Sequence, residues 1–220
     1  MQAGLRTLSS TVNNVLHLHN PPQANFARFD VGELLKWAYD FLLPLAKQAR
    51  VEMQIVNGLE RVFIAADRHR LEQVLLNLAL NAFHFMPNGG WLSFHGRVDA
   101  DNANAIAIEV RDTGPGIPSS HLPRIFDAGF STRPGSSGLG LAVCRRILEQ
   151  HGGTIQVQSK LMSGTTFLLE LPRQQVTPEV LLAVPSPDLK SDSLTVAAYR
   201  APLRDNISVA LSQNAEAAGL

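Results

Sequence analysis

A glycine- and serine-rich run at residues 135–142, GSSGLGLA, limits the fold of this chain more than any other feature. An apolar, helix-patterned segment at 139–151 follows directly, and Gly152-Gly153 ends it. Glycines let the backbone of such a loop move, and the N-terminus of the helix behind it has unpaired N–H groups and a positive dipole. The pattern predicts an anion-binding site there. It fits neither the G-x-x-x-x-G-K-[ST] motif nor a strand-linked G-x-G-x-x-G motif.

Charge and cysteine content exclude several functions. The 19 Lys and Arg residues balance the 19 Asp and Glu residues, so no global field favours nucleic acid or an anionic membrane. The single cysteine, Cys144, fits a reducing compartment, and we expect it to be a buried apolar group. No leader opens the chain, and no apolar run reaches the ~18 residues of a spanning helix. We expect a cytoplasmic location, no nucleic-acid partner and no membrane contact by this chain; a membrane-bound parent protein stays open.

Hydrophobic periodicity predicts alternating helices and strands. Helices are expected at 1–19, at 31–49 with a kink or break at Pro44, at 120–126, at 139–151, and behind an Asp67 cap with a buried face of Leu71, Val74, Leu75, Leu78, Ala82 and Phe85. Strands are expected at 51–56, 61–66, 91–98, 105–112, 154–159 and 165–171, the first two joined as a hairpin through Asn57-Gly58. This order predicts an α+β fold and not a doubly wound parallel sheet.

Four further motifs have residues suited to one site: QVLLNLALNAFHFMPNGG (73–90), RDTGPGIP (111–118), IFDAGFST (125–132) and SGTTF (163–167). Asn77 and Asn81 lie four apart on a helix, where an amide oxygen could bind Mg2+ or simply pair with nearby backbone. Asp112 can accept a hydrogen bond from an exocyclic amine such as that of adenine. Gly114 and Gly116 would let the backbone approach a flat ligand. The alternatives are an ordinary Asp-Thr-Gly turn and an aspartic protease, which needs a second such carboxylate.

Together, these motifs resemble the ATP-binding domain shared by sensor histidine kinases, gyrase, MutL and the heat-shock chaperone, the Bergerat-type GHKL superfamily. The likeness covers roughly residues 29–172 and is strongest to nitrogen-regulation-type bacterial histidine kinases. LLNLALNAFHFM is similar to their N box, DTGPGIP to the first glycine box, IFDAGFST to the phenylalanine box, GSSGLGLA to the second glycine box and GTTFLLELP to the closing strand. The resemblance implies a two-layer α/β sandwich, a mixed, largely antiparallel sheet with helices on one face, that binds ATP and Mg2+ between the helices and a lid.

The resemblance also implies roles for individual residues. Asn81 would hold Mg2+ against the triphosphate, Asp112 would bind the adenine amino group, and Thr165 would support the base. Residues 126–137 would form a mobile lid. His84 stands where relatives often carry a phosphate-facing polar or basic residue, the alternative being an exposed helix histidine. The other implied nucleotide-binding positions are Gly114, Gly116, Ile117, Phe126, Gly138, Leu139, Gly140 and Leu141.

Asn77 bears on the type of reaction. Hydrolysing relatives carry at this place a glutamate that activates water, whereas an asparagine cannot act as a general base. We therefore count Asn77 with Asn81 and His84 as catalytic positions in the transfer of the ATP γ-phosphoryl group to a histidine. The implied protein is the catalytic part of a two-component sensor histidine kinase, with a response regulator as partner. A GHKL-type ATPase and a nucleotide-binding scaffold without turnover are the alternatives.

The acceptor histidine of such a kinase is missing from the sequence. Neither His17 nor His19 fits the acceptor pattern, and the histidines at 69, 95, 121 and 151 are expected at surface or strand-end positions. We expect residues 1–28 to be a remnant of the second helix of a dimerisation hairpin with its linker, and 173–220 to be a disordered tail. The acceptor-histidine dimerisation domain would then lie upstream or in another chain, and homodimerisation stays open.

Overall fold

The computed structural model describes residues 25–99, 102 and 104–173, so the expected helix at 1–19 and the expected tail lie outside the described residues. The described part contains α2 (Val31–Ala49), α3 (Arg68–Phe85), α4 (Gly140–Gln150) and the short 3-10 helix η1 (Leu122–Arg124). Its strands are β1 (Ala27–Asp30), β2 (Val51–Asn57), β3 (Phe63–Ala66), β4 (Gly90–Val98), β5 (Ala105–Asp112), β6 (Thr154–Ser159) and β7 (Thr165–Pro172).

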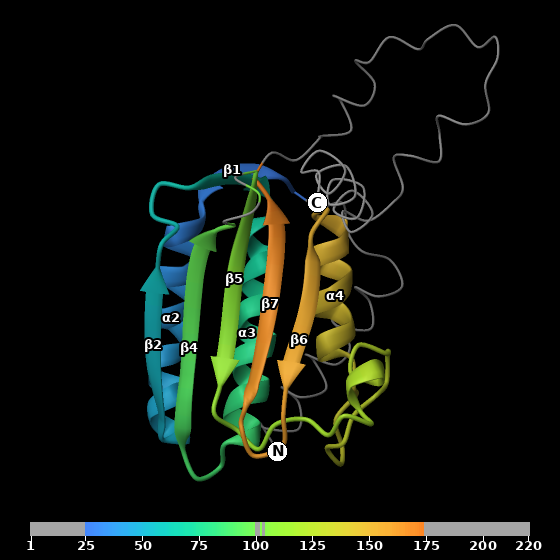
Figure 1. Ribbon diagram of the computed structural model, residues 1–220. Coiled ribbons are helices and arrows are strands. Elements are labelled where there is room, and N and C mark those ends of the chain that lie inside the picture. The colour runs from blue at the N-terminus through green and yellow to red at the C-terminus, as the bar shows by residue number, and fades with distance from the viewer. Residues whose placement is uncertain (1–24, 100–101, 103, 174–220) are drawn as a thin grey trace, which may run out of the picture. The chain divides into compact units, whose positions relative to one another are not determined.

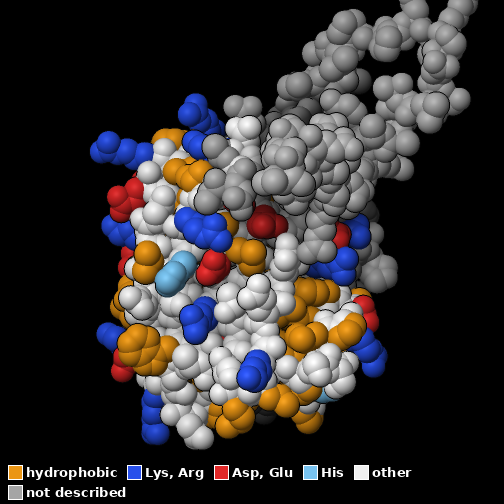
Figure 2. Space-filling view, viewed as in Figure 1, with side chains coloured by type: hydrophobic (Ala, Val, Ile, Leu, Met, Phe, Trp, Pro, Cys, Tyr) orange, Lys and Arg blue, Asp and Glu red, His pale blue; other side chains and the backbone are white. Residues whose placement is uncertain are grey.

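Five of these strands form one mixed sheet in the order β2-β4-β5-β7-β6. β2 is parallel to β4, and the other neighbours are antiparallel. Helices α2, α3 and α4 cover one face of this sheet (Figure 1). The predicted α+β class is confirmed. The opposite face has charged side chains of both signs between neutral ones (Figure 2), including an ion pair of 3.2 Å between Arg97 and Glu109.

The core fills the space between the sheet and the helices. Alternate residues of β7, namely Phe167, Leu169 and Leu171, are buried, as period-two alternation requires of a sheet covered on one face. On α2 the helix continues through Pro44, so the predicted break is wrong. Pro44 is exposed, where the loss of one backbone hydrogen bond is compensated by water. Among the described helices, none is long and apolar enough to cross a membrane.

The predicted hairpin at Asn57-Gly58 is also wrong. β2 pairs with β4, whereas β3 pairs with β1 in a separate two-stranded antiparallel sheet. Gly58 donates its N–H to the carbonyl of Gly96 at 2.8 Å, and a Cβ at Gly58 would lie 2.8 Å from the same oxygen. Glycine is therefore required because the chain approaches β4 closely. Asn57 bonds the carbonyl of Gly32 and the N–H of Leu59 through its side chain.

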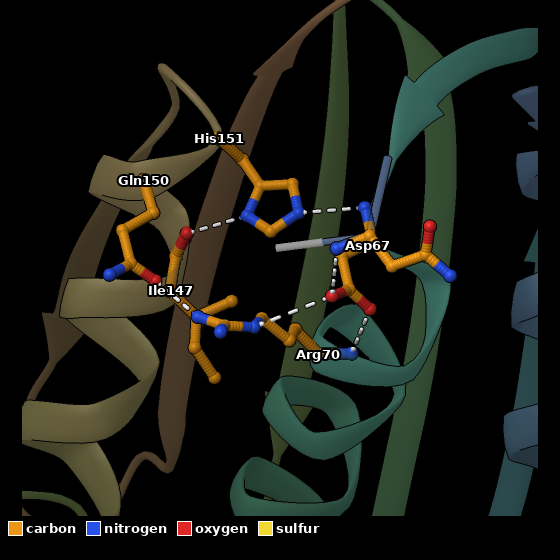
Figure 3. Close-up of polar contacts among 6 residues, drawn as sticks. Asp67, Arg70, Ile147, Gln150 and His151 are labelled. Carbon is orange, nitrogen blue, oxygen red and sulfur yellow. Dashed lines mark hydrogen bonds and ion pairs between the residues drawn. The ribbon is translucent and has the colours of Figure 1, made fainter. Parts of the chain in front are cut away.

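A polar junction joins the start of α3 to the end of α4 (Figure 3). Asp67 caps α3, as predicted, by accepting from the N–H of Arg70 at 3.2 Å. The sequence predicts a surface or strand-end position for His151, which is instead the cap residue at the end of α4 and is 1% exposed. Its Nε2 accepts from the Asp67 N–H at 3.0 Å, and its Nδ1 lies 2.7 Å from the Ile147 carbonyl oxygen. Because that oxygen can only accept, His151 carries its proton on Nδ1.

Candidate active site

A cleft of about 310 Å³ lies between the last turns of α3, the start of α4, the loop after β5 and the segment that precedes α4. The sequence-predicted residues that line it are Asn81, Asp112, Gly116, Ile117, Gly138, Gly140, Leu141 and Thr165. These residues are separated by up to 84 positions in the sequence, and the fold brings them to one cavity. Asn77, His84, Gly114, Phe126 and Leu139 are not among the lining residues.

One end of the cleft is formed by the paired ends of β5 and β7. Asp112 ends β5 and lies in register with Thr165, which begins β7. An Asp112 carboxylate oxygen accepts from the Gly114 N–H at 2.8 Å, which explains why Gly114 is close to the site without lining it. Burial raises the pKa of Asp112, while hydrogen bonds from the Gly114 and Thr165 backbones lower it. The carboxylate thus stands partly desolvated where it can accept a hydrogen bond from a ligand.

The first glycine-rich loop rests on the turn between β6 and β7. Gly116 has φ +73°, and a Cβ at this position would overlap the carbonyl oxygen of Lys160. The N–H of Met162 also donates to the carbonyl of Pro115 at 2.8 Å. Glycine at 116 is therefore required by the turn and by its contact with Lys160. Close ligand approach, the reason expected from the sequence, is not needed to explain it.

Another part of the cleft wall is the N-terminus of α4, where Gly140 and Leu141 line the cleft. The helix begins at Gly140, and its cap residue Leu139 makes no side-chain hydrogen bond to the first turn. No acidic residue occupies that turn. Free N–H groups and the positive end of the helix dipole therefore favour an anion at this end. Gly138, at φ +66°, accepts from the Gly129 N–H at 3.1 Å, so the two ends of the intervening loop touch each other.

Three polar residues of α3 lie at different places relative to the cleft. Asn81 lines it, and its side chain makes no hydrogen bond to any described residue. Asn77, one turn earlier, donates to the carbonyl of Gly140 at 3.4 Å and so links α3 to the first turn of α4. His84 is exposed near the end of α3; partial burial and the charge of Arg133 lower its pKa. The predicted buried face of α3 is correct except for Phe85, which is 45% exposed and lines the cleft.

The residues expected to form the lid divide into two groups. Phe126 is partly buried and packs edge-on against the core residue Phe167, with ring centroids 6.5 Å apart. Phe130 instead lines the cleft, where the ring of His121 and the guanidinium of Arg124 contact it. Arg133 also lines the cleft and places a cation beside it. From the sequence, Phe130 and Arg133 were predicted only as parts of the lid, and His121 only as a surface or strand-end residue; the basic residue just before the glycine-serine run was the available signal for a cation beside the cleft.

The fit to a magnesium ion can be judged from these donors. Asn81 offers an unpaired amide oxygen, a ligand type suited to Mg2+. In the described part of the chain, no group of three or more His, Cys, Asp or Glu side chains could hold a metal ion by itself. An Mg2+ ion would therefore take its remaining ligands from phosphate oxygens and water, as Mg2+ commonly does beside nucleotides. With phosphate oxygens and water as the other ligands, the residues of the cleft fit an Mg2+ ion.

Comparison with known protein families shows to which family the chain belongs. The model of the histidine kinase-, DNA gyrase B- and HSP90-like ATPase family matches residues 66–175, which is half of the chain. The chain belongs to this ATPase family. The predicted resemblance is thereby confirmed, and the motif residues Asn81, Asp112, Gly138 and Thr165 all fall within the matched range.

Relatives of this ATPase domain include sensor histidine kinases. The chain is 37% identical over 166 residues to the sensor histidine kinase ZraS of Escherichia coli K12, covering 75% of this chain and 35% of ZraS. It is 34% identical over 148 residues to the alginate biosynthesis sensor protein KinB of Pseudomonas aeruginosa, covering 66% of this chain and 24% of KinB. The chain thus spans about a third or less of these relatives.

Solved structures agree with the fold. Full-length ShkA in complex with AMPPNP superposes with a TM-score of 0.65 at 31% identity, covering 75% of this chain and 35% of ShkA. The histidine kinase ThkA in complex with the response regulator TrrA gives a TM-score of 0.65 at 28% identity, covering 78% and 49%. The nucleotide-free catalytic domain of ThkA matches over 97% of its length at 30% identity, with a TM-score of 0.59.

Proposed function

We propose that this chain is the ATP-binding catalytic portion of a two-component sensor histidine kinase, which transfers the γ-phosphoryl group of ATP to a histidine. One observation carries the proposal: the cleft joins a hydrogen-bond acceptor, Asp112, to an uncapped helix N-terminus at Gly140, with the unpaired amide of Asn81 lining it as well. Such a cleft suits a ligand with an amine at one end and a polyanion at the other. ATP has this form.

The residues act mainly by positioning and by neutralising charge, which dominate catalysis of phosphoryl transfer. Asp112 and Thr165 would hold the base, and the N–H groups of the first turn of α4 would bind the phosphates. Asn81 would ligate an Mg2+ ion, which when bound neutralises phosphate charge. Arg133, on the lid, would add a second cation near the phosphates, and His84 would lie beside it.

The proposed reaction needs a nucleophile from outside the cleft. Asn77 is occupied by its contact to Gly140 and cannot take a proton from water, so hydrolysis should be slow. A histidine delivered by a dimerisation domain, upstream or in another chain, would attack the γ-phosphorus instead, forming an N–P bond as the γ-phosphorus–oxygen bond breaks and ADP leaves. The names of the relatives support this reading: ZraS is a sensor histidine kinase, and ThkA was solved with a response regulator. A response-regulator partner and a cytoplasmic site of action are part of the proposal.

Labelled ATP tests the proposal directly. The chain is mixed with Mg2+, γ-labelled ATP and a separately produced hairpin that carries an acceptor histidine. We expect acid-labile label on the hairpin, and little free phosphate without it. Free phosphate released equally with and without the hairpin would favour a GHKL-type ATPase. ATP binding with neither product would leave a nucleotide-binding scaffold.

A further inference from the structure

Ser159 lies at the last position of β6, where two parts of the cleft wall meet, although it does not line the cleft. Its Oγ accepts from the N–H of Ile117 at 2.8 Å and donates to the carbonyl of Gly164 at 2.9 Å. The same Oγ lies 3.0 Å from the hydroxyl oxygen of Thr165. Ile117 and Thr165 both line the cleft. One hydroxyl group therefore fastens the first glycine-rich loop and the start of β7 to each other.

The proton of each hydroxyl group can be assigned from these three contacts. A serine hydroxyl has one proton and two lone pairs. The carbonyl of Gly164 can only accept, so it takes the Ser159 proton; the N–H of Ile117 can only donate, so it takes one lone pair. The second lone pair faces Thr165, and Thr165 must be the donor in that contact. The hydroxyl proton of Thr165 is thus directed at Ser159, and its oxygen can only accept on the cleft side.

This assignment determines which ligand groups the end of the cleft can bind. Asp112, the register partner of Thr165, is also an acceptor when ionised. Two acceptors side by side match a donor, such as the exocyclic amino group of a base. A carbonyl oxygen at the same place would face acceptors only and would lose its own hydrogen bonds to water.

We propose that Ser159 is a positioning residue that makes the site selective for a nucleotide base with an exocyclic amino group, by holding the proton of Thr165 away from the ligand. The inference rests on the proposed function, because it requires the base to lie against Asp112 and Thr165. It adds a residue that acts through Thr165 and not through direct contact with the nucleotide.

The test compares two nucleotides that differ along one edge of the base. ATP has an amino group where inosine triphosphate has a carbonyl oxygen, and the neighbouring ring nitrogen, an acceptor in ATP, carries a proton in inosine triphosphate. Calorimetry on the full chain should show that the wild type binds ATP at least about tenfold more tightly. In Ser159→Ala the Thr165 hydroxyl can rotate and donate to the carbonyl. The ratio of the dissociation constant of inosine triphosphate to that of ATP should then fall about three- to tenfold. Asp112 should maintain the preference for ATP that is left.

Two variants control the result. Ser163→Ala removes an exposed hydroxyl from the same turn, which contacts only the Leu161 carbonyl at 3.5 Å, and should leave the ratio unchanged. Ser159→Thr keeps the hydroxyl and should restore most of the ratio. If Ser159→Ala folds and retains the wild-type ratio, the inference is wrong. If Ser159→Ala does not fold, Thr165→Val is the second test of the inference. Thr165→Val removes the acceptor oxygen and must also lower the ratio. A wild type that binds neither nucleotide overturns the proposed function and this inference together, which distinguishes that failure from an unchanged ratio.

Discussion

The role of Asp112 in ATP binding can be tested by a single substitution. Its carboxylate accepts from Gly114 and stands partly desolvated at the end of the cleft. In Asp112→Asn the charge is lost while size is kept, so we expect ATP binding to weaken by roughly 1.5–3 kcal/mol, the range for hydrogen bonds to charged groups. Isothermal calorimetry measures the loss, with circular dichroism to show that the fold is kept. Unchanged affinity in a folded variant would remove Asp112 from the site.

His151 predicts how stability depends on pH. Burial lowers its pKa below the ordinary 6.5; hydrogen bonding to the Ile147 carbonyl and the charge of Asp67 raise it, and the charge of Arg70 lowers it. Since the net direction is downward, the unfolded chain binds the proton better than the folded one. The contribution of neutral His151 to the stability of the folded state is therefore present above pH 6.5. It is lost as the pH falls below that value toward the folded-state pKa of His151.

Urea unfolding between pH 7.5 and pH 5 measures this effect. The free energy of unfolding of the wild type should fall across that interval more steeply than that of His151→Gln. His69→Gln is the matched control, because the His69 side chain is 89% exposed and pairs at 3.0 Å with Glu72 on its own helix. It should keep the wild-type slope. Equal slopes in the wild type and His151→Gln would show that His151 does not contribute.

At the scale of elements, the contact between Gly129 and Gly138, which joins the two ends of the lid loop, can be tested with two glycines of that loop. Gly135 and Gly138 have φ of +73° and +66°, so alanine is strained at both by about 1 kcal/mol or more. Only at Gly138 would a Cβ lie 2.5 Å from the backbone of Gly129; at Gly135 nothing lies within 4 Å. Gly138→Ala should therefore separate Gly138 from Gly129 and speed chymotrypsin cleavage after Phe130, while weakening ATP binding. Equal cleavage rates in Gly138→Ala and Gly135→Ala would contradict this.

The same scale shows what the sequence could predict and what it could not. Periodicity and caps located α2, α3 and α4 within a residue or two, because these signals are local: Asp67 is a cap wherever its helix lies. Strand pairing is not local. Asn57-Gly58 has the composition of a hairpin turn, yet the glycine is required by a contact with β4, some 38 residues away. β1 escaped notice because four residues show little alternation.

For the site, the motif residues were predicted and the residues that hold them were not. Asn81, Asp112 and Thr165 stand in recognisable sequence patterns, and the structure brings them to one cleft. Ser159 and His121 contact the first glycine-rich loop and the lid residue Phe130, and no spacing in the sequence records these contacts. His151 was misjudged for the same reason: its burial depends on Asp67, 84 positions away.

At the scale of the whole molecule, the domain boundary is testable. The sequence placed the ATP-binding domain at 29–172, but β1 begins at Ala27, and the Asn25 N–H donates to the Asp67 carboxylate at 2.9 Å. The Phe26 ring also lies 5.0 Å from the buried ring of His151. A fragment of residues 25–173 keeps all of these contacts. It should therefore unfold cooperatively and gain thermal stability with ATP and Mg2+, by about 2.7 kcal/mol at 100 times the dissociation constant.

A fragment of residues 31–173 is the matched comparison. It removes β1, so the edge of β3 is exposed, and it removes the Asp30 carboxylate that accepts from the N–H groups of Gly32 and Arg61. Loss of the α2 cap alone costs about 1 kcal/mol. We expect a lower melting temperature in differential scanning calorimetry and a shift of similar size on adding ATP, because none of the described residues before Asn81 lines the cleft. Equal melting temperatures of the two fragments would place the start of the domain after β1.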